Sequence, residues 1–356
     1  MLSKKYIIVP DSFKGCLTSM RVAEAMTEGI KAVDTEADIT SLIVSDGGEG
    51  MLDAIMATVD TKEMVCHSFD PLMRRIDVRY AISGTTAYIE SALTCGMSLL
   101  TQEELNPMVA TTYGLGYIIA DAMNLGCKNI VVGLGGSATC DAGIGMLKAI
   151  NDKFSKNGHF DDNVRNRIKD VKFTILADVT NPLLGDNGAA RVFAPQKGAS
   201  PKDVESLEWR IKKFTSMSAK HFGYDRSPEP SAGAAGGLGY AFMQYLNADV
   251  CSGADYILSL CKYDDVVRNA DIVITGEGSA DAQTLMGKLP FKVLKRASGV
   301  PVHLFAGRIK DVEKLKEAGF TSVNCINTES MPVEECLKSE TAYKNILAAV
   351  RNIPNI

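Results

Sequence analysis

The chain has 356 residues, of which 46% are hydrophobic and 23% charged, and its formal net charge is −5. These values are typical of a globular protein with room for two domains, and the charge argues against a nucleic-acid partner. The nine cysteines form no Cys-x-x-Cys pair and the four histidines are widely spaced, which argues against zinc and indicates reduced thiols in a cytoplasmic protein. No apolar run is long enough for a signal peptide or a membrane-spanning helix, so we expect no membrane partner.

The chain begins with two strand-helix pairs. An apolar run at residues 6–9 predicts a buried strand, and apolar residues at helical spacing follow at 22–33. A second apolar run at 42–44 predicts the next strand, and helical spacing resumes at 51–56.

The middle of the chain has a different pattern. From about residue 61 to 264, strands come in pairs, at 76–82 and 87–90, and glycine-rich loops are frequent. A mostly polar helix at 202–222 is expected on the surface. We interpret residues 61–264 as a second α/β domain that is inserted after the second helix.

The last ninety residues again alternate strand and helix. Strands are expected at 271–274, 302–305 and 322–326, and helices at 290–298, 311–318 and 343–350. Together with the first two strands they predict a five-stranded parallel sheet of flavodoxin type, order 2-1-3-4-5, because right-handed crossovers leave few other topologies. Residues 1–60 and 265–356 would form this discontinuous domain.

The strand order also predicts where a ligand binds. In the order 2-1-3-4-5 the switch point lies between the first and third strands, and ligands bind beyond the carboxyl ends of the strands there. Those ends carry residues 11–15 and 275–278, and the second strand adds Asp46 and Glu49. We therefore expect an active site in the cleft between the flavodoxin-like domain and the inserted domain.

A glycine-rich stretch after the strand at 130–132 is the most informative motif. It runs through Gly135, Gly136, Ser137 and Thr139 into a helix. Backbone N–H groups in such a loop bind phosphate or carboxylate. The stretch also fits the G-x-G-x-x-A dinucleotide fingerprint, but no second strand with an acidic end follows about twenty residues later, which argues against a nicotinamide-dependent dehydrogenase.

Three other motifs have a functional and a structural interpretation. Asp46 in a glycine-rich loop suits Mg²⁺, or it favours a helix N-terminus. Lys14, in the loop at 10–15 with Ser12, can neutralise a phosphate, or it is a solvated lysine in a turn. Asp178 and Asn181 follow a strand at 173–177, where they can bind a ligand or form an Asx turn.

The segment at 276–290 combines two carboxylates, an amide and a lysine. Glu277 and Gln283 are candidate binding residues, and Asp281 is placed to orient or deprotonate a hydroxyl group. The glycines at 233–239 have no ionisable neighbour, so close helix packing explains the later ones best.

Taken together, eight segments in the same order resemble the type I glycerate kinase family. They are residues 10–15, 46–50, 111–114, 135–139, 178–183, 195–199, 233–237 and 275–278. The resemblance runs nearly end to end and implies a flavodoxin-like domain with an inserted second domain. It also implies phosphorylation of D-glycerate on its 2-hydroxyl by ATP with Mg²⁺, giving 2-phosphoglycerate.

In this interpretation Asp46 and Asp178 hold Mg²⁺, Lys14 balances phosphate charge, and Asp281 orients the attacking hydroxyl; Asp178, Lys14 and Asp281 form the catalytic set. The phosphate and substrate contacts then fall to Ser12, Gly135, Gly136, Ser137, Thr139, Asn181, Glu277 and Gln283.

The chain departs from the family pattern at several positions. Ser279 stands where arginine is usual, Cys140 where asparagine is usual, and Tyr117 where glutamate is usual; Met73 replaces a glycine. Losing an arginine from a phosphate-handling loop is not a small change. The departures leave a non-catalytic hydroxy-acid-binding module as the alternative function.

Overall fold

The computed structural model describes residues 3–13, 15–156, 162–328 and 330–353. The chain divides into two compact units, one formed by residues 1–46, 53–58 and 254–356, and the other by residues 47–52 and 59–253. In the described part of the chain, no helix is both long and apolar enough to cross a membrane.

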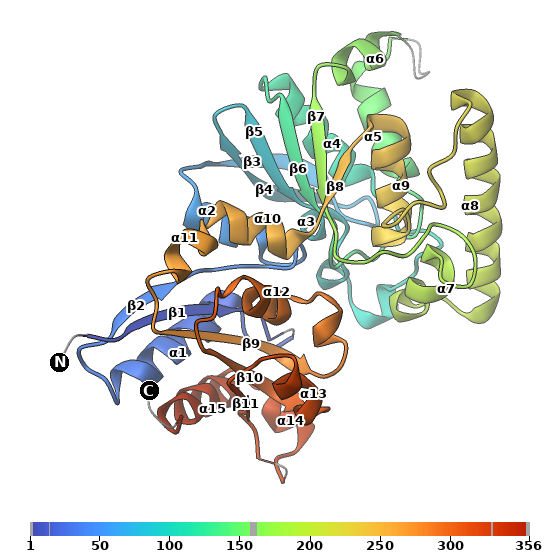
Figure 1. Ribbon diagram of the computed structural model, residues 1–356. Coiled ribbons are helices and arrows are strands. Elements are labelled where there is room, and N and C mark those ends of the chain that lie inside the picture. The colour runs from blue at the N-terminus through green and yellow to red at the C-terminus, as the bar shows by residue number, and fades with distance from the viewer. Residues whose placement is uncertain (1–2, 14, 157–161, 329, 354–356) are drawn as a thin grey trace. The chain divides into compact units, whose positions relative to one another are not determined.

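The first unit is built on a parallel sheet of five strands in the order β11-β10-β9-β1-β2 (Figure 1). Its strands are β1 (Lys5–Pro10), β2 (Asp38–Ser41), β9 (Ile272–Ala280), β10 (Val302–Ile309) and β11 (Ser322–Cys325). Its helices are α1 (Ser19–Lys31), α10 (Gly253–Leu260), α11 (Tyr263–Val267), α12 (Leu289–Arg296), α13 (Val312–Glu317), α14 (Val333–Cys336) and α15 (Ser339–Arg351). The residues of α2 (Met51–Thr58) are divided between the two units. The predicted fold class and the strand order 2-1-3-4-5 are confirmed.

Two element boundaries in this unit differ from the prediction. The second strand is β2, Asp38–Ser41, and the apolar run at 42–44 follows it without strand pairing. Residues 275–278 were expected to form a loop, but they lie inside β9, which continues to Ala280. Gly276 fits there because a Cβ at this position would lie 2.7 Å from the carbonyl oxygen of Phe305 on β10.

The second unit contains a mixed sheet of six strands in the order β3-β4-β5-β6-β7-β8. The strands are β3 (Lys62–Phe69), β4 (Arg75–Ser83), β5 (Thr86–Glu90), β6 (Asn129–Gly133), β7 (Lys172–Leu176) and β8 (Asp249–Cys251). The helices are α3 (Ala92–Cys95), α4 (Tyr113–Asn124), α5 (Ile144–Phe154), α6 (Asp162–Ile168), α7 (Ala189–Phe193), α8 (Pro201–Phe222) and α9 (Ala234–Leu246). β3, β4 and β5 pair antiparallel, and the other pairs are parallel.

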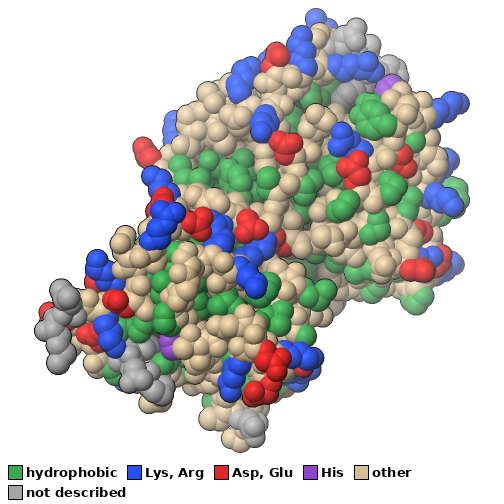
Figure 2. All heavy atoms as spheres, in the orientation of Figure 1, with side chains coloured by type: hydrophobic (Ala, Val, Ile, Leu, Met, Phe, Trp, Pro, Cys, Tyr) green, Lys and Arg blue, Asp and Glu red, His purple; other side chains and the backbone are tan. Residues whose placement is uncertain are grey.

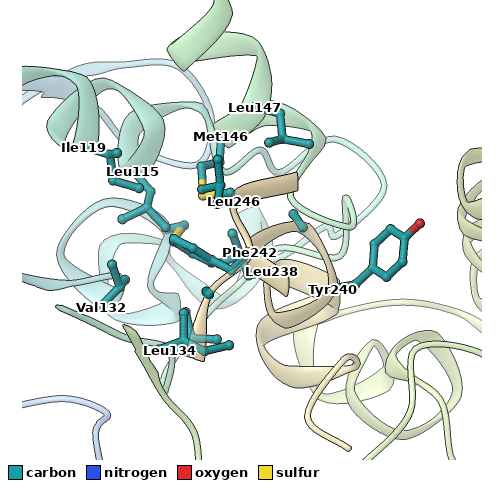
Figure 3. Close-up of a cluster of buried hydrophobic side chains, with 14 of the residues drawn as sticks. Leu115, Ile119, Val132, Leu134, Met146, Leu147, Leu238, Tyr240, Phe242 and Leu246 are labelled. Atoms are coloured by element: carbon teal, nitrogen blue, oxygen red, sulfur yellow. The ribbon is translucent and has the colours of Figure 1, made fainter. Parts of the chain in front are cut away.

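The core of the second unit gathers side chains from α4, β6, α5 and α9. Leu115, Val132, Met146 and Phe242 are buried in it, and Figure 3 shows them converging. The glycines of α9 pack closely, as expected: a Cβ at Gly239 would lie 2.0 Å from the carbonyl oxygen of Ser231. A Cβ at Gly236 would lie 2.0 Å from the carbonyl oxygen of Thr139, so α9 also packs closely against the loop between β6 and α5. On the face drawn in Figure 2, acidic and basic side chains are interspersed.

Candidate functional site

The loop that follows β6 is held by another glycine-rich segment of the same unit. A Cβ at Gly133 would lie 2.4 Å from the carbonyl oxygen of Gly47, and one at Gly135 would lie 2.4 Å from Gly48 Cα. The glycines at 47 and 48 are buried. The glycines at 47 and 48 therefore serve the close contact between two backbone segments.

A carboxylate from β5 caps the helix that follows this loop. Glu90 is buried, and its two carboxylate oxygens accept hydrogen bonds from Gly50 N (3.1 Å) and Leu52 N (3.0 Å) at the start of α2. Negative charge at a helix N-terminus is favourable. The cap is thus supplied by Glu90, which sequence analysis had not assigned a role. Asp46, half-buried, precedes these glycines and follows the buried Ser45.

The other side of the β6–α5 loop offers free backbone donors. Gly135 N donates to Gly47 O at 3.3 Å, so the protein itself uses this N–H group. The N–H groups of Gly136 and Ser137 have no hydrogen-bond partner among the described residues. Gly136 is half-exposed and has a φ of +80°, a conformation that glycine adopts without strain. Two adjacent N–H groups therefore remain for an anionic ligand.

A buried lysine lies against this loop. Lys197, the last residue of the 3-10 turn η3 (Pro195–Lys197), is 3% exposed. Its Nζ donates to Ser137 Oγ at 2.9 Å and to the carbonyl oxygen of Thr139 at 2.7 Å. Burial lowers the pKa of Lys197 to about 8, against the raising effects of Cys140, Cys95 and Asp141. Sequence analysis included this lysine within residues 195–199 but gave it no role; the only local signal was a lysine followed by a glycine in a short segment that begins with a proline.

An aspartate fixes the start of α5. Asp141 accepts hydrogen bonds from Thr112 N (2.9 Å), Gly143 N (2.9 Å) and Gly145 N (3.1 Å). It also accepts a hydrogen bond from the Thr112 hydroxyl at 2.9 Å, so both carboxylate oxygens are used within the unit. The side-chain oxygen of Thr139, two residues earlier, is buried without a hydrogen-bond partner among the described residues.

The predicted residues after β7 lie at the end of the strand. Asp178 is exposed, and Asn181 is half-buried with its Nδ2 donating to Asn187 O at 2.9 Å. Asn181 thus stabilises its own loop through the amide nitrogen. This bond is not an Asx turn, in which the side-chain oxygen accepts from the backbone, and Asp178 has an exposed carboxylate.

In the first unit, the segment that follows β1 lies beside the middle of β9. Asp11 N donates to Gly276 O at 2.8 Å, and the Asp11 carboxylate accepts from Ser12 N at 2.7 Å. Ser12 is half-buried. Lys14 lies outside the described residues, so its predicted role stays a prediction.

Glu277 is a buried residue of β9. Its carboxylate accepts hydrogen bonds from the hydroxyl of Thr284 and, at 3.3 Å, from Lys288 Nζ. Burial raises the pKa of Glu277, against the lowering effects of Thr284 and Lys288. These contacts connect β9 to the turn that carries the next two candidates.

Asp281 and Gln283 lie in that turn. Asp281 Oδ1 accepts a hydrogen bond from Gln283 N at 2.8 Å, which is an Asx-turn contact. Asp281 Oδ2 has no partner among the described residues. Asp281 is half-buried, and the Gln283 side chain is exposed. One carboxylate oxygen therefore shapes the turn, and the other remains available.

Within the described residues, no group of three or more histidine, cysteine or acidic side chains could hold a metal ion. Mg²⁺ commonly takes one or two protein carboxylates together with phosphate oxygens and water. The exposed Asp178 and the half-buried Asp46 provide oxygen donors of the kind that Mg²⁺ prefers. The chemistry of each carboxylate taken by itself therefore fits a Mg²⁺ ligand.

Two of the departures from the family pattern are structural positions. Cys140 is 1% exposed and burial raises the pKa of its thiol to about 11. The ring of Tyr117 packs edge-on against Phe69, with centroids 5.8 Å apart. Both side chains contribute to packing within the second unit.

Comparison with known proteins places the chain in a family. Residues 6–356 match the model of the glycerate kinase family. The chain is 35% identical to the glycerate 2-kinase of Escherichia coli K12, over 98% of this chain and 97% of that protein. It is 34% identical to the glycerate kinase of Bacillus subtilis 168, over 95% and 94%. A crystal structure from Salmonella typhimurium LT2, described as a presumed glycerate kinase 2, superposes with a TM-score of 0.80 at 30% identity, covering 98% of this chain and 97% of the other.

Proposed function

Because the chain belongs to the glycerate kinase family, we propose that it transfers the γ-phosphoryl group of Mg-ATP to the 2-hydroxyl of D-glycerate. The products are 2-phosphoglycerate and ADP. The O2–Pγ bond forms as the bond from Pγ to the bridging oxygen breaks. The observation that carries the proposal is a loop with two unpartnered N–H groups, at Gly136 and Ser137, in a chain that aligns end to end with a glycerate 2-kinase.

The residues of the loop bind charge in this mechanism. Phosphoryl transfer depends chiefly on positioning and on neutralising charge. The N–H groups of Gly136 and Ser137 donate to an anionic substrate group, and Lys14 balances phosphate charge. Asp46 and Asp178 hold the Mg²⁺ that accompanies ATP, which stabilises charge on the phosphate oxygens.

Asp281 acts on the acceptor hydroxyl. Its Oδ1 is held in the turn by Gln283 N, which fixes the direction of the carboxylate. Its Oδ2 accepts the hydrogen bond from the 2-hydroxyl and takes the proton as the new O–P bond forms. Ser12, Asn181 and Gln283 are proposed substrate contacts. Thr139, named as a contact in the sequence analysis, is fully buried and supports the loop by accepting a hydrogen bond from Lys197 at its carbonyl oxygen. Gly135 and Glu277 support the site, since their polar groups bind Gly47 and Thr284.

The test is a coupled ADP-release assay over a panel of small hydroxy acids, with the phosphorylated carbon identified by ³¹P NMR. We expect turnover with D-glycerate, far slower turnover with lactate, and phosphate on carbon 2. Folded protein that binds D-glycerate without releasing ADP would instead be a hydroxy-acid-binding module. Binding of NADH in place of Mg-ATP would favour a dehydrogenase.

A further inference from the structure

Lys197 carries a charge that the protein does not neutralise. Its ammonium contacts a hydroxyl and a carbonyl oxygen, both uncharged. Among the described residues, no carboxylate lies within ion-pair distance of Nζ. A buried cation without a counterion is costly, and proteins rarely keep one unless it is paired or used.

The titratable groups around Lys197 do not provide that counterion. Burial raises the pKa of Cys95 to about 12 and that of Cys140 to about 11, so both thiols are neutral near pH 7. The Asp141 carboxylate forms no ion pair with Lys197 and instead accepts hydrogen bonds from Thr112, Gly143 and Gly145. None of these three groups therefore forms an ion pair with the Lys197 ammonium.

The hydrogen bond between Lys197 and Ser137 links the buried ammonium to the β6–α5 loop. Ser137 Oγ accepts a hydrogen bond from Lys197, so its own hydroxyl hydrogen remains free to donate. A donor that is itself hydrogen-bonded to a cation is polarised and binds an anion more strongly. The unpartnered N–H groups of Gly136 and Ser137 lie in the same loop, and the orphan hydroxyl of Thr139 is two residues further on.

We propose that Lys197 is a positioning residue, which acts through Ser137 to give the β6–α5 loop its affinity for an oxyanion of the substrates. This inference rests on the proposed function and identifies the source of charge at the loop. The oxyanion is either the carboxylate of the hydroxy acid or a phosphate of the nucleotide. The two sources differ in which substrate's KM responds to loss of the lysine.

Lys197→Met tests the charge at nearly constant volume, and Ser137→Ala tests the hydroxyl that relays it. We expect either variant to raise the KM of one substrate about tenfold, the effect of losing a charge-assisted hydrogen bond, with a smaller change in kcat. A rise in the KM of D-glycerate identifies the carboxylate, and a rise in the KM of Mg-ATP identifies a phosphate. The matched control is Lys202→Met, an exposed lysine near the start of α8, which should leave both constants unchanged.

A pH profile separates this role from a purely structural one. The pKa of Lys197 is lowered to about 8, so in the wild type kcat/KM for the affected substrate should fall as pH rises above about 8. Since kcat/KM reports groups of the free enzyme, the Lys197→Met profile should lack this fall. A variant that is merely destabilised would keep the wild-type profile shape at lower amplitude, which would overturn the inference.

Direct binding makes the inference independent of turnover. Calorimetry with Mg-ADP and with D-glycerate, on folded wild type and on both variants, should show weaker binding of the same ligand in both variants. Ser137→Ala keeps the buried lysine, so it remains informative if Lys197→Met does not fold. Unchanged affinity for both ligands overturns the inference even where the wild type phosphorylates glycerate. If the wild type shows no turnover, the proposed function is refuted, and the comparison of binding affinities then tests the role of Lys197 by itself. If the wild type binds neither ligand, the proposed function and the inference about Lys197 are both overturned.

Discussion

Arg308 on β10 lies directly opposite Ser279 on β9 in the parallel register of the five-stranded sheet. Ser279 is the position where the family pattern usually has arginine. Paired residues of neighbouring strands project to the same face of a sheet. Arg308 is exposed, and it has no ion-pair partner among the described residues. On the strand next to Ser279, the chain thus carries a guanidinium that forms no ion pair within the part of the chain that the structure describes.

We predict that Arg308→Ala lowers kcat/KM for Mg-ATP about tenfold, because a guanidinium binds phosphate through charge-assisted hydrogen bonds. The decisive measurement is the double variant Ser279→Arg/Arg308→Ala, which should recover most of the activity. Arg268→Ala removes an exposed arginine that pairs with Asp265 and serves as the control. A double variant no better than Arg308→Ala would show that the two positions are not interchangeable.

We predict that Asp281→Asn abolishes turnover and leaves Mg-ATP affinity nearly intact. Asparagine keeps the Oδ1 acceptor for Gln283 N, so the turn persists and thermal stability should change little. The lost charge removes the group that accepts the hydroxyl proton. Steady-state kinetics and nucleotide titration on the same preparation provide the measurement.

Asp311→Asn is the matched control for this experiment. Asp311 contacts the same turn by accepting a hydrogen bond from Ala282 N, and it pairs with Lys314. It should retain turnover. Normal kcat in Asp281→Asn would leave Asp281 as a turn residue only.

We predict that Asp46→Asn moves the Mg²⁺ requirement to much higher concentration. A neutral amide oxygen is a weaker ligand than a carboxylate for a cation that takes few protein ligands. The measurement is activity against Mg²⁺ concentration at fixed ATP. Glu49→Gln, the exposed carboxylate of the same loop, tests whether local charge alone explains the effect. An identical shift in both variants would argue against ligation by Asp46.

The strand order could be predicted because strand and helix alternate at both ends of the chain and crossovers are right-handed. The second strand was misplaced because β2 is mostly exposed and polar, whereas the apolar run at 42–44 only follows it. Residues 275–278 looked like a loop because two glycines interrupt the apolar pattern of β9. Position 276 requires glycine because the neighbouring strand β10 lies too close for a Cβ, and the local sequence does not reveal this contact.

The candidate site likewise contains features that could be predicted from the sequence and features that could not. The β6–α5 loop could be predicted to bind an anion because glycines and hydroxyl residues cluster in one short stretch. Two of its N–H groups have no partner among the described residues, as an anion-binding loop requires. The burial of Lys197 could not be predicted, because a lysine is normally exposed and its burial here depends on contacts with residues about sixty positions away in the chain. The capping of α2 by Glu90 could not be predicted either, because Glu90 lies forty residues from the helix start in the sequence. Tertiary contacts decide which charged side chains are buried.

The last prediction concerns the packing that supports the loop. In Gly133→Ala the new methyl group would lie 2.4 Å from both Gly47 O and Met51 Sδ. Overpacking of this kind costs roughly 1–3 kcal/mol of stability, so the midpoint of urea unfolding should fall. The displaced backbone should also weaken anion binding at Gly136 and Ser137, which a rise in substrate KM would report.

Gly84→Ala provides the comparison. Gly84 has a φ of +57° and no heavy atom within 4 Å of a built Cβ, so alanine there adds backbone strain of about 1 kcal/mol without a clash. It should unfold at a higher urea concentration than Gly133→Ala and keep the wild-type KM values. If Gly133→Ala matched Gly84→Ala in both measurements, the contact between the 47–52 segment and the β6–α5 loop would not be what holds the anion-binding groups in place.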